Sequence, residues 1–250
     1  MQKTIFSELN PNISVNCVTL GFAQNELKVL VNINEVKKGK NVSSVYALPE
    51  SLIRHEESLK DSAKRILKDF TNPDKVYFEQ LYTFGKVDRN KKHDIEWMRL
   101  LGLHADERLI SVTYFALLKP DLFVSEQTLF DKKTEWIPFN KLPKLAFDHN
   151  DIVEKALLTL KRKLKFEALG IELLPDNFTL SELQALYETV LDTSFDKRNF
   201  RRKILNSGLF ENTFKKQTAV THKPAELFTI NKEKYDLLRS GKFDLAFINF

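Results

Sequence analysis

The segment from Phe178 to Leu205 constrains the fold of this chain more than any other, because its pattern is that of two helices joined by a short turn. Thr179 opens the first helix and Glu182 stands three residues later, which is the pattern of a capping box, and Phe178 before it is a possible hydrophobic staple. Apolar residues then recur with the period of a helix. They are Leu180, Leu183, Leu186, Tyr187, Val190 and Leu191. The polar residues 192–195 form the turn, so the sequence predicts a helix-turn-helix.

The second helix, DKRNFRRKIL, is apolar on one side and basic on the other. At about 100° per residue, Phe200 and Ile204 share a narrow docking face, and Arg198 and Arg202 point away from it. Asp196 is the expected N-cap, next to the positive end of the helix dipole. Arg and Asn side chains suit base edges and phosphates. A solvated helix face is the alternative, although such a face would more often mix Glu with Lys.

The stretch that follows, residues 211–230, contains polar turn residues and ends in the strand-like AELFTI, which could supply a wing. This layout is typical of a winged helix whose second helix enters the major groove of DNA, and a homodimer on a two-fold symmetric operator is expected. A winged helix that binds only proteins stays open as another alternative. The side chains expected to contact double-stranded DNA are Lys197, Arg198, Asn199, Arg201, Arg202, Lys215, Lys216 and Lys223.

The charge of the chain is unevenly placed. Residues 161–250 contain 16 Lys and Arg against 12 Asp and Glu, whereas residues 1–160 contain 23 against 22. The basic excess therefore lies with the expected DNA-binding segment. Cys17 is the one cysteine, which excludes an internal disulfide framework, and no apolar run reaches the length of a membrane span or a signal segment. These features predict a cytoplasmic protein without a membrane partner.

The sequence lacks the common motifs for cofactor binding and for nucleophilic catalysis. It contains no P-loop, no dinucleotide-binding glycine motif and no serine-nucleophile elbow. Its five histidines do not have the spacing of metal ligands. We therefore expect neither a metal nor another cofactor. His149, in FDHND, could bind an effector or belong to the start of a helix, and the sequence does not distinguish the two.

The N-terminal part alternates strand and helix patterns, which predicts an α+β fold with a mixed sheet. Gly170 and Pro175 then interrupt the helical patterns, and we expect an effector-binding domain over residues 1–165 and a DNA-binding domain over 166–250. The expected elements are a hairpin of NISVNCVTLGF and ELKVLVNI across residues 23–25, a helix at about 58–70, strands YFEQLYTFG and LISVTYFALL, and a last helix beginning after the cap candidates Asp148 and Asn150.

The stretch LPESLIRHEESLKDSAKRILKDFTN, residues 48–72, resembles a Nudix box, in which carboxylates on one helix face hold divalent cations. Aligned on spacing, Glu57, Arg65 and Leu67 match the box. The positions that depart from it are Ser51 and Asn72, where the box has Gly, and Ile66, Asp69 and Phe70, where it has Glu. Ile66 and Phe70 make the metal-binding stripe apolar, so we expect an ordinary packed helix face and no efficient Nudix hydrolysis.

Together, the damaged box and the basic helix-turn-helix resemble the Nudix-related transcriptional regulators. The resemblance runs from about Asn12 to Ile230 and is most specific in LPDNFTLSELQALYE and DKRNFRRKIL. It implies a Nudix-like α/β/α sandwich with a mixed sheet, a C-terminal winged helix and a homodimer. Members of this family regulate NAD metabolism or sugar utilisation. The stretch 90–105 looks like an insertion relative to the family pattern.

The resemblance also implies a small effector, which we expect to be a sugar or a sugar nucleotide. Arginine pairs with phosphate more naturally than with a neutral sugar, although surface salt bridges are the alternative role for each arginine. A Nudix hydrolase of a nucleoside diphosphate derivative such as ADP-ribose is the alternative function for the chain. The candidate effector contacts are Arg54, Tyr82, Phe84, Arg89, Arg108, Ser111 and Tyr114.

Overall fold

The computed structural model describes residues 9–38, 41–71, 73–87, 89, 108–122, 133–218 and 223–240. The insertion expected at 90–105 and Asn72 of the box lie outside these residues. The chain divides into two compact units. The first comprises Met1–Gly21, Lys28–Leu118 and Leu122–Ala156, and the second comprises Phe22–Leu27, Lys119–Asp121 and Leu157–Phe250.

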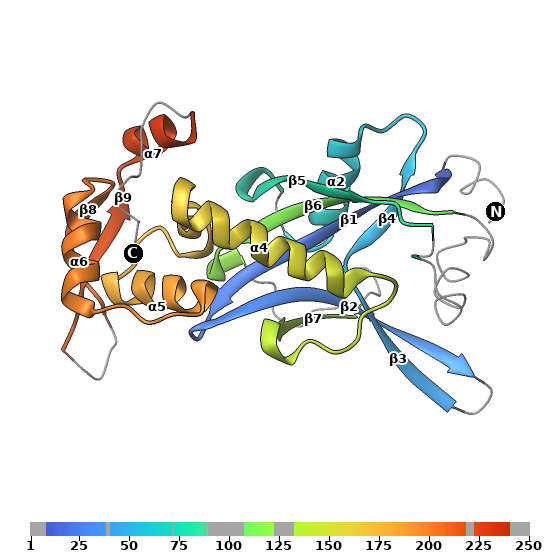
Figure 1. Ribbon diagram of the computed structural model, residues 1–250, viewed down its shortest axis with the longest axis horizontal. Helices are drawn as coiled ribbons and strands as arrows, with labels where there is room; N and C mark the ends of the chain where they lie inside the picture. Colours follow the sequence, from blue (N-terminus) through green and yellow to red (C-terminus); the bar gives the residue numbers. More distant parts are fainter. Residues whose placement is uncertain are drawn as a thin grey trace. The chain divides into compact units, whose positions relative to one another are not determined.

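The first unit is built on a mixed sheet (Figure 1), in which seven strands fall within the described residues. Its strand order is β3-β2-β1-β6-β5, with β4 paired to β1 and β7 paired to β2. β1 and β6 run parallel, whereas β5 is antiparallel to β6, so the prediction of a mixed sheet is confirmed. The strands are β1 (Leu9–Ala23), β2 (Glu26–Lys38), β3 (Asn41–Ala47), β4 (Glu50–Arg54), β5 (Tyr77–Phe84), β6 (Ile110–Leu118) and β7 (Lys133–Pro138).

The tight turn between β1 and β2 is formed by Gln24 and Asn25, whose φ angles are 57° and 59°. Two consecutive left-handed residues are what a type I′ turn requires, and the twist of that turn matches the twist of a hairpin. Asn is among the residues that adopt this conformation most readily. The hairpin predicted across residues 23–25 is therefore confirmed.

One face of the sheet packs against α2 (Leu59–Lys68), which begins at the N-cap Ser58, where the Ser58 Oγ accepts a hydrogen bond of 3.2 Å from the Asp61 N–H. The buried helix residues and the odd-numbered residues of β1 share one apolar cluster with even-numbered residues of β6. This alternation places the intervening strand residues on the opposite face. The cluster includes Ala63, Ile66, Leu67, Phe70, Val15, Cys17, Val112 and Tyr114.

The opposite face holds buried polar groups near the start of α4 (His149–Glu167). The Arg89 side chain, which is 2% exposed, forms a two-point ion pair with the Asp148 carboxylate at 2.6 Å and 3.2 Å. Asn150 accepts a hydrogen bond from the Leu145 N–H at 2.8 Å. The helix begins directly after Asp148, whereas Asn150, the other cap candidate, lies within its first turn, and both side chains hold neighbouring segments.

His149 is fully buried among the polar side chains near the start of α4. Its Nδ1 accepts a hydrogen bond of 3.1 Å from the Leu48 N–H, and a nitrogen that accepts from a backbone donor carries no proton. Burial, together with the positive charge of Arg89, lowers the pKa of His149 to about 3. His149 is therefore neutral in the folded protein and serves the packing of the helix start, not an exposed binding surface.

This burial predicts a loss of stability in acid. Unfolded His149 binds a proton below its ordinary pKa of 6.5, whereas the folded ring resists protonation down to about pH 3. The contribution of His149 to the free energy of unfolding is complete above pH 6.5. It is lost as the pH falls, by at most about 1.4 kcal/mol per pH unit. Urea titrations at pH 5 and 7 should show a smaller pH dependence in His149→Gln. The exposed His55→Gln is the control, and an equal slope in all three proteins would contradict the prediction.

The second unit contains a helical core followed by a two-stranded sheet. Gly170 sits where a Cβ would lie 2.3 Å from Leu164 Cδ1, so any other residue there would force the Leu164 side chain to move. The described elements that follow are α5 (Leu180–Leu191), α6 (Lys197–Asn206), β8 (Phe210–Lys216), β9 (Glu226–Ile230) and α7 (Lys232–Arg239).

Candidate nucleic-acid interface and effector site

Helix α5 has the predicted capping box. The Thr179 Oγ1 accepts a hydrogen bond from the Glu182 N–H at 3.1 Å, and the Glu182 carboxylate accepts one from the Thr179 N–H at 2.7 Å. At the other end, Asp192 adopts a left-handed φ of 55° and stops the helix. The capping box and the left-handed Asp192 thus set the two ends of α5 where they were predicted.

The turn between α5 and α6 is held by side chains of α5. Glu188 accepts a hydrogen bond of 2.9 Å from the Phe195 N–H, and Gln184 donates one of 3.0 Å to the Phe195 carbonyl. Asp196 then caps α6 by accepting from the Asn199 N–H at 2.8 Å, as predicted. These bonds fix the direction in which α6 leaves the turn.

Helix α6 is anchored by Phe200 and Ile204, both fully buried. The Phe200 ring lies 5.8 Å from the ring centroids of both Tyr187 and Phe195. The predicted docking face is therefore confirmed. With this anchor, Arg198 and Arg202 are exposed, and the Arg202 guanidinium donates a hydrogen bond of 2.8 Å to the Asn199 amide oxygen.

Arg201 differs from the expected outward orientation. Its side chain is half-buried against α5, and its Nη2 lies 3.4 Å from the Ser181 Oγ. Its Nε is buried and, within the described part of the chain, has no hydrogen-bond partner. The reason is that Arg201 is only about 100° around the helix from Phe200, so it points sideways.

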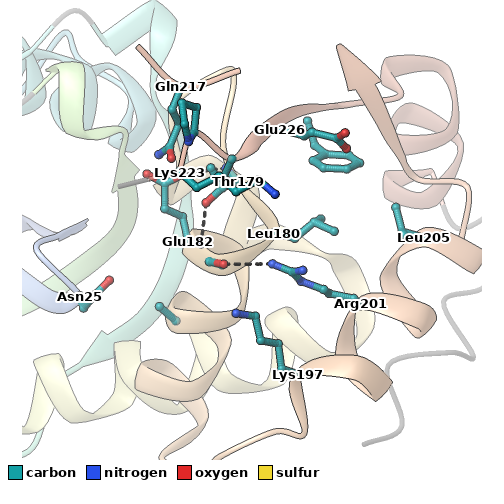
Figure 2. Close-up of a pocket in the computed structure, with 15 residues that line it drawn as sticks. Asn25, Thr179, Leu180, Glu182, Lys197, Arg201, Leu205, Gln217, Lys223 and Glu226 are labelled. Atoms are coloured by element: carbon teal, nitrogen blue, oxygen red, sulfur yellow. Dashed lines mark hydrogen bonds between the residues drawn. The ribbon is translucent and has the colours of Figure 1, made fainter. Parts of the chain in front are cut away.

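A pocket of about 780 Å³ lies beside Arg201, between the start of α5, the side of α6 and the inner edge of the wing. Figure 2 shows Lys197 and Arg201 reaching from α6 toward α5, with Lys223 on the wing side. Glu182 and Glu226 also line this pocket, and their carboxylates accept hydrogen bonds from the Thr179 N–H and the Asn212 side-chain amide. Three cations against two carboxylates make the pocket cationic by one charge, and it adjoins the positive end of the α5 dipole.

The wing is formed by the antiparallel strands β8 and β9. Lys215 and Lys216 at the end of β8 are exposed, and so is Lys223 before β9. The predicted basic side chains of the second unit thus lie on α6 and on the wing.

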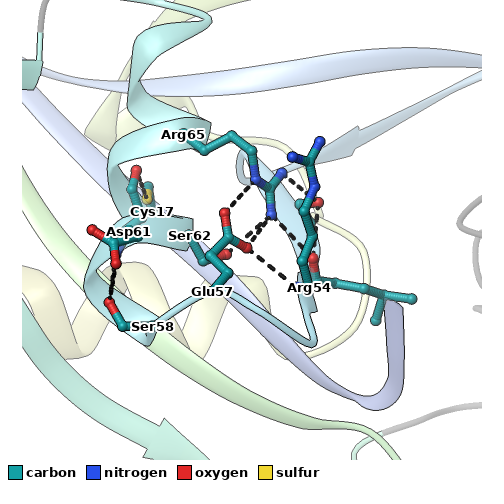
Figure 3. Close-up of polar contacts among 10 residues, drawn as sticks. Cys17, Arg54, Glu57, Ser58, Asp61, Ser62 and Arg65 are labelled. Atoms are coloured by element: carbon teal, nitrogen blue, oxygen red, sulfur yellow. Dashed lines mark hydrogen bonds and ion pairs between the residues drawn. The ribbon is translucent and has the colours of Figure 1, made fainter. Parts of the chain in front are cut away.

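Two of the residues that match the Nudix box, Glu57 and Arg65, lie in a polar cluster (Figure 3). Arg65 donates to both Glu57 carboxylate oxygens, at 2.7 Å and 2.8 Å, and to the Ser51 Oγ at 3.0 Å. It also donates to the Leu52 carbonyl at 3.2 Å. Burial acts to raise the pKa of Glu57, but the hydrogen bonds and charge of Arg65 outweigh it and lower that pKa. The matching residues therefore fasten the loop before α2 and leave Glu57 engaged.

Two of the positions that depart from the box, Ile66 and Phe70, are packed in the core. Ile66 is 4% exposed and Phe70 is 5% exposed, both inside the apolar cluster, so the predicted packed helix face is confirmed. Asp69 is partly exposed. Within the described ranges, no three His, Cys, Asp or Glu side chains are grouped as metal ligands. On this helix, hydrocarbon occupies the positions where the box has two of its carboxylates.

The seven candidate effector contacts do not surround one cleft. Ser111 is buried and bonded to the Ser14 Oγ at 3.0 Å, whereas Tyr114 lies on the other face of the sheet, 6.0 Å from the Phe78 ring. Successive strand residues point to opposite faces, so positions 111 and 114 cannot share a surface. Arg89 is committed to Asp148. The expectation of a single site for all seven is contradicted by the strand register.

The other four candidates have accessible side chains. Tyr82 is 54% exposed, its ring meets the Phe84 ring edge-on at 5.1 Å, and the Lys155 Nζ lies 5.2 Å from its centroid. Arg54 is exposed, and so is Arg108, which donates a hydrogen bond of 2.6 Å to the Gly85 carbonyl.

Two polar side chains at these surfaces were missed from the sequence. Lys155 belongs to α4, and only the three-dimensional fold brings it to the β5 residue Tyr82. Ser181 was part of the capped helix and gave no separate signal. An i,i+20 contact such as Ser181 with Arg201 has no sequence period that could indicate it.

Both halves of the chain are similar to known proteins. Residues 170–230 match the family model of the NrtR DNA-binding winged helix domain. A protein of Acinetobacter baylyi named "ADPR responsive transcriptional repressor NtrR" is 29% identical over 231 residues, which cover 91% of this chain and 85% of that protein. The crystal structure of Shewanella oneidensis NrtR complexed with a 27mer DNA aligns with a TM-score of 0.68 and 25% identity, covering 90% of this chain and 95% of that one.

A MutT/nudix family protein from Enterococcus faecalis has a similar fold, with a TM-score of 0.61 and 21% identity over 89% of this chain and 87% of that chain. Among the helices that the structure describes, none has the length and hydrophobicity needed to cross a membrane. A mixed Nudix-like sheet is thus followed along the chain by a helix-turn-helix with a wing. These last elements lie within the residues that match the NrtR winged helix. Residues 170–230 are therefore an NrtR-type winged helix domain, and the chain as a whole is similar to the Nudix-related transcriptional regulators.

Proposed function

We propose that the chain is a sequence-specific DNA-binding transcriptional regulator that acts as a homodimer. The observation that carries this proposal is the exposed pair Arg198 and Arg202, presented by a helix that Phe200 and Ile204 anchor from behind. Arginine forks spaced one turn apart can hydrogen-bond guanine edges in the major groove. One module makes limited contact, which favours two copies on a symmetric operator. The Shewanella oneidensis NrtR structure with DNA supports the same use of this domain.

The cationic pocket would receive a backbone phosphate of the same duplex. Arg201 offers a buried Nε without a partner in the described part of the chain, and Lys197 lines the same pocket. A phosphate oxygen would satisfy that N–H and would also face the first turn of α5. In this role Arg201 positions the protein on DNA, while Arg198 and Arg202 read sequence.

The effector is proposed to be a sugar nucleotide, and ADP-ribose is the first choice. The Acinetobacter baylyi relative is named as ADPR responsive. Arg54 and Arg108 have exposed side chains suited to a diphosphate, and the Tyr82–Phe84 pair has ring surface for a base or a sugar. Ser111, Tyr114 and Arg89 are engaged in the fold and would act only by supporting their neighbours.

Regulation without hydrolysis is the proposed use of the Nudix-like domain. Hydrolysis is the second candidate, and the retained Arg65–Glu57 pair, which matches the box, favours it. The buried Ile66 and Phe70 favour the regulator, because a Nudix centre needs carboxylates at those positions to hold its cations.

The proposal predicts selective capture of DNA that responds to ADP-ribose. The full chain should enrich a two-fold symmetric duplex from the upstream DNA of its own gene, and ADP-ribose should change its affinity for that duplex. Mass action also predicts a rise in melting temperature with ADP-ribose. AMP and free ribose serve as controls for the ligand. Failure to enrich any duplex would overturn the DNA-binding function, whereas enrichment without any ADP-ribose effect would overturn only the effector.

A further inference from the structure

Phe214 on β8 is the most exposed large apolar side chain among the described residues, with 92% of its surface accessible. It is followed by the exposed Lys215 and Lys216. Its backbone has a φ of 59°, in the left-handed region. A bulky residue there is a genuine outlier, because its Cβ crowds the backbone. The wing therefore holds an aromatic ring in water and in a strained conformation at the same time.

The surrounding wing holds this conformation in place. Asn212 pairs with Phe228 and Lys216 with Glu226, so three residues of β8 bulge out opposite the single residue Leu227. The Asn212 amide oxygen accepts a hydrogen bond from the Phe214 N–H at 2.7 Å. Bulges re-aim side chains, and strain that neighbours enforce marks places where function requires it.

Thr213 completes the bulge. Its Oγ1 donates to the Leu227 carbonyl at 2.7 Å and accepts from the Lys215 N–H at 3.3 Å. Side chains on both sides of Phe214 are thus used to shape the backbone and not to cover the ring. The bulge presents one apolar group that is followed directly by two cations.

That combination fits the minor groove of DNA. Proteins that bend DNA insert apolar side chains such as Phe between base pairs, while basic residues contact the flanking phosphates. A protein partner would bury a wider apolar surface than one ring, and the neighbouring lysines would lose hydration in such an interface. The exposed arginines of α6 belong to the same unit.

We propose that Phe214 is a wedge that enters the minor groove next to the half-site contacted by α6, unstacks one base step and bends the duplex. This inference rests on the proposed DNA-binding function and adds a residue and a deformation to it. The wedge gives specificity at a step that no side chain reads by hydrogen bonds, because flexible pyrimidine–purine steps unstack most easily.

The test uses the full chain and the enriched duplex, with 2-aminopurine placed in turn at each step and a donor–acceptor dye pair on the ends. Wild-type protein should raise 2-aminopurine fluorescence at one step in each half-site and shorten the end-to-end distance. Phe214→Ala should abolish both signals and weaken binding about tenfold, while Phe214→Leu should keep part of both. Phe166→Ala, which removes an exposed ring on α4, is the matched control and should behave as wild type.

Phe214→Gly separates binding from folding. Glycine adopts a φ of 59° without strain, so this variant should melt at or above the wild-type temperature and still lose the fluorescence signal. Binding by wild type without unstacking, or full bending by Phe214→Ala, would overturn the wedge and leave the proposed function standing. Unchanged DNA binding by Phe214→Ala with a changed oligomeric mass would assign the ring to a protein contact. Absence of any duplex binding by wild type would instead overturn the proposed function.

Discussion

Replacing Arg198 and Arg202 together by alanine is expected to weaken operator binding by about thirtyfold or more. Each arginine that reads a base contributes about 1–3 kcal/mol, and the two side chains face the same groove one helical turn apart. Both are exposed, so their removal should leave the melting temperature of the protein nearly unchanged. The Asn199 bond that orients Arg202 makes the second substitution the more damaging of the two.

Fluorescence anisotropy with operator and scrambled duplexes measures this effect. The double variant should bind both duplexes alike, because base readout is lost while phosphate contacts remain. Lys215→Ala and Lys223→Ala should instead weaken both duplexes equally and reduce the salt dependence. Arg162→Ala, which removes an exposed arginine from α4, is the matched control. Retention of the full preference for operator by the double variant would make α6 a solvated helix face.

The parts of the fold that are determined by local signals could be predicted from the sequence. The capping box of Thr179, the Asp196 cap and the Phe200–Ile204 spacing each act within one or two turns of helix. The turn at Gln24 and Asn25 is equally local. Short-range hydrogen bonds and steric limits decide these features, so they are visible before any tertiary contact is known.

The features that depend on register or on distant partners could not be predicted. Strand β7 is defined only by its pairing with β2, and residues 41–47 form a strand because β2 offers an edge. The sequence also placed Ser111 and Tyr114 in one site, although three positions along a strand reverse the face. Candidate contacts are therefore best judged by the register of the sheet that carries them.

Arg201 and Phe214 were misjudged or missed for a related reason. The sideways direction of Arg201 follows from its place on the helix, but the contact it makes there, with Ser181 on another helix, has no signal in the sequence. The exposure of Phe214 follows from a bulge that the opposing strand creates. In both cases the residue type was visible in the sequence, but the surface on which it acts was not.

Introducing the missing carboxylate of the Nudix box, by Ile66→Glu, is expected to unfold the domain before it restores any chemistry. Ile66 is 4% exposed and packs with Leu67, Phe70 and Tyr114. A carboxylate without a partner in such surroundings costs about 3–5 kcal/mol. The loss should be largest near neutral pH and smaller toward pH 4, where the raised pKa of the buried acid leaves it uncharged. Ile66→Val, which removes one methyl group, should cost only about 0.5–1.5 kcal/mol.

Urea titrations of both variants at pH 4.5 and 7, beside an assay of ADP-ribose hydrolysis with magnesium, separate stability from catalysis. Neither the wild type nor Ile66→Glu should release AMP above background, because the substitution adds one carboxylate while Phe70 still fills the next position. The domain would be a hydrolase if wild-type protein turned over ADP-ribose and lost that activity in Asp69→Ala or Glu57→Ala. The Glu57 result needs the melting temperature as a control, since Glu57 also holds Arg65 through two hydrogen bonds. Asp69→Ala needs the same control, because Asp69 is only partly exposed and its charge acts on Arg65.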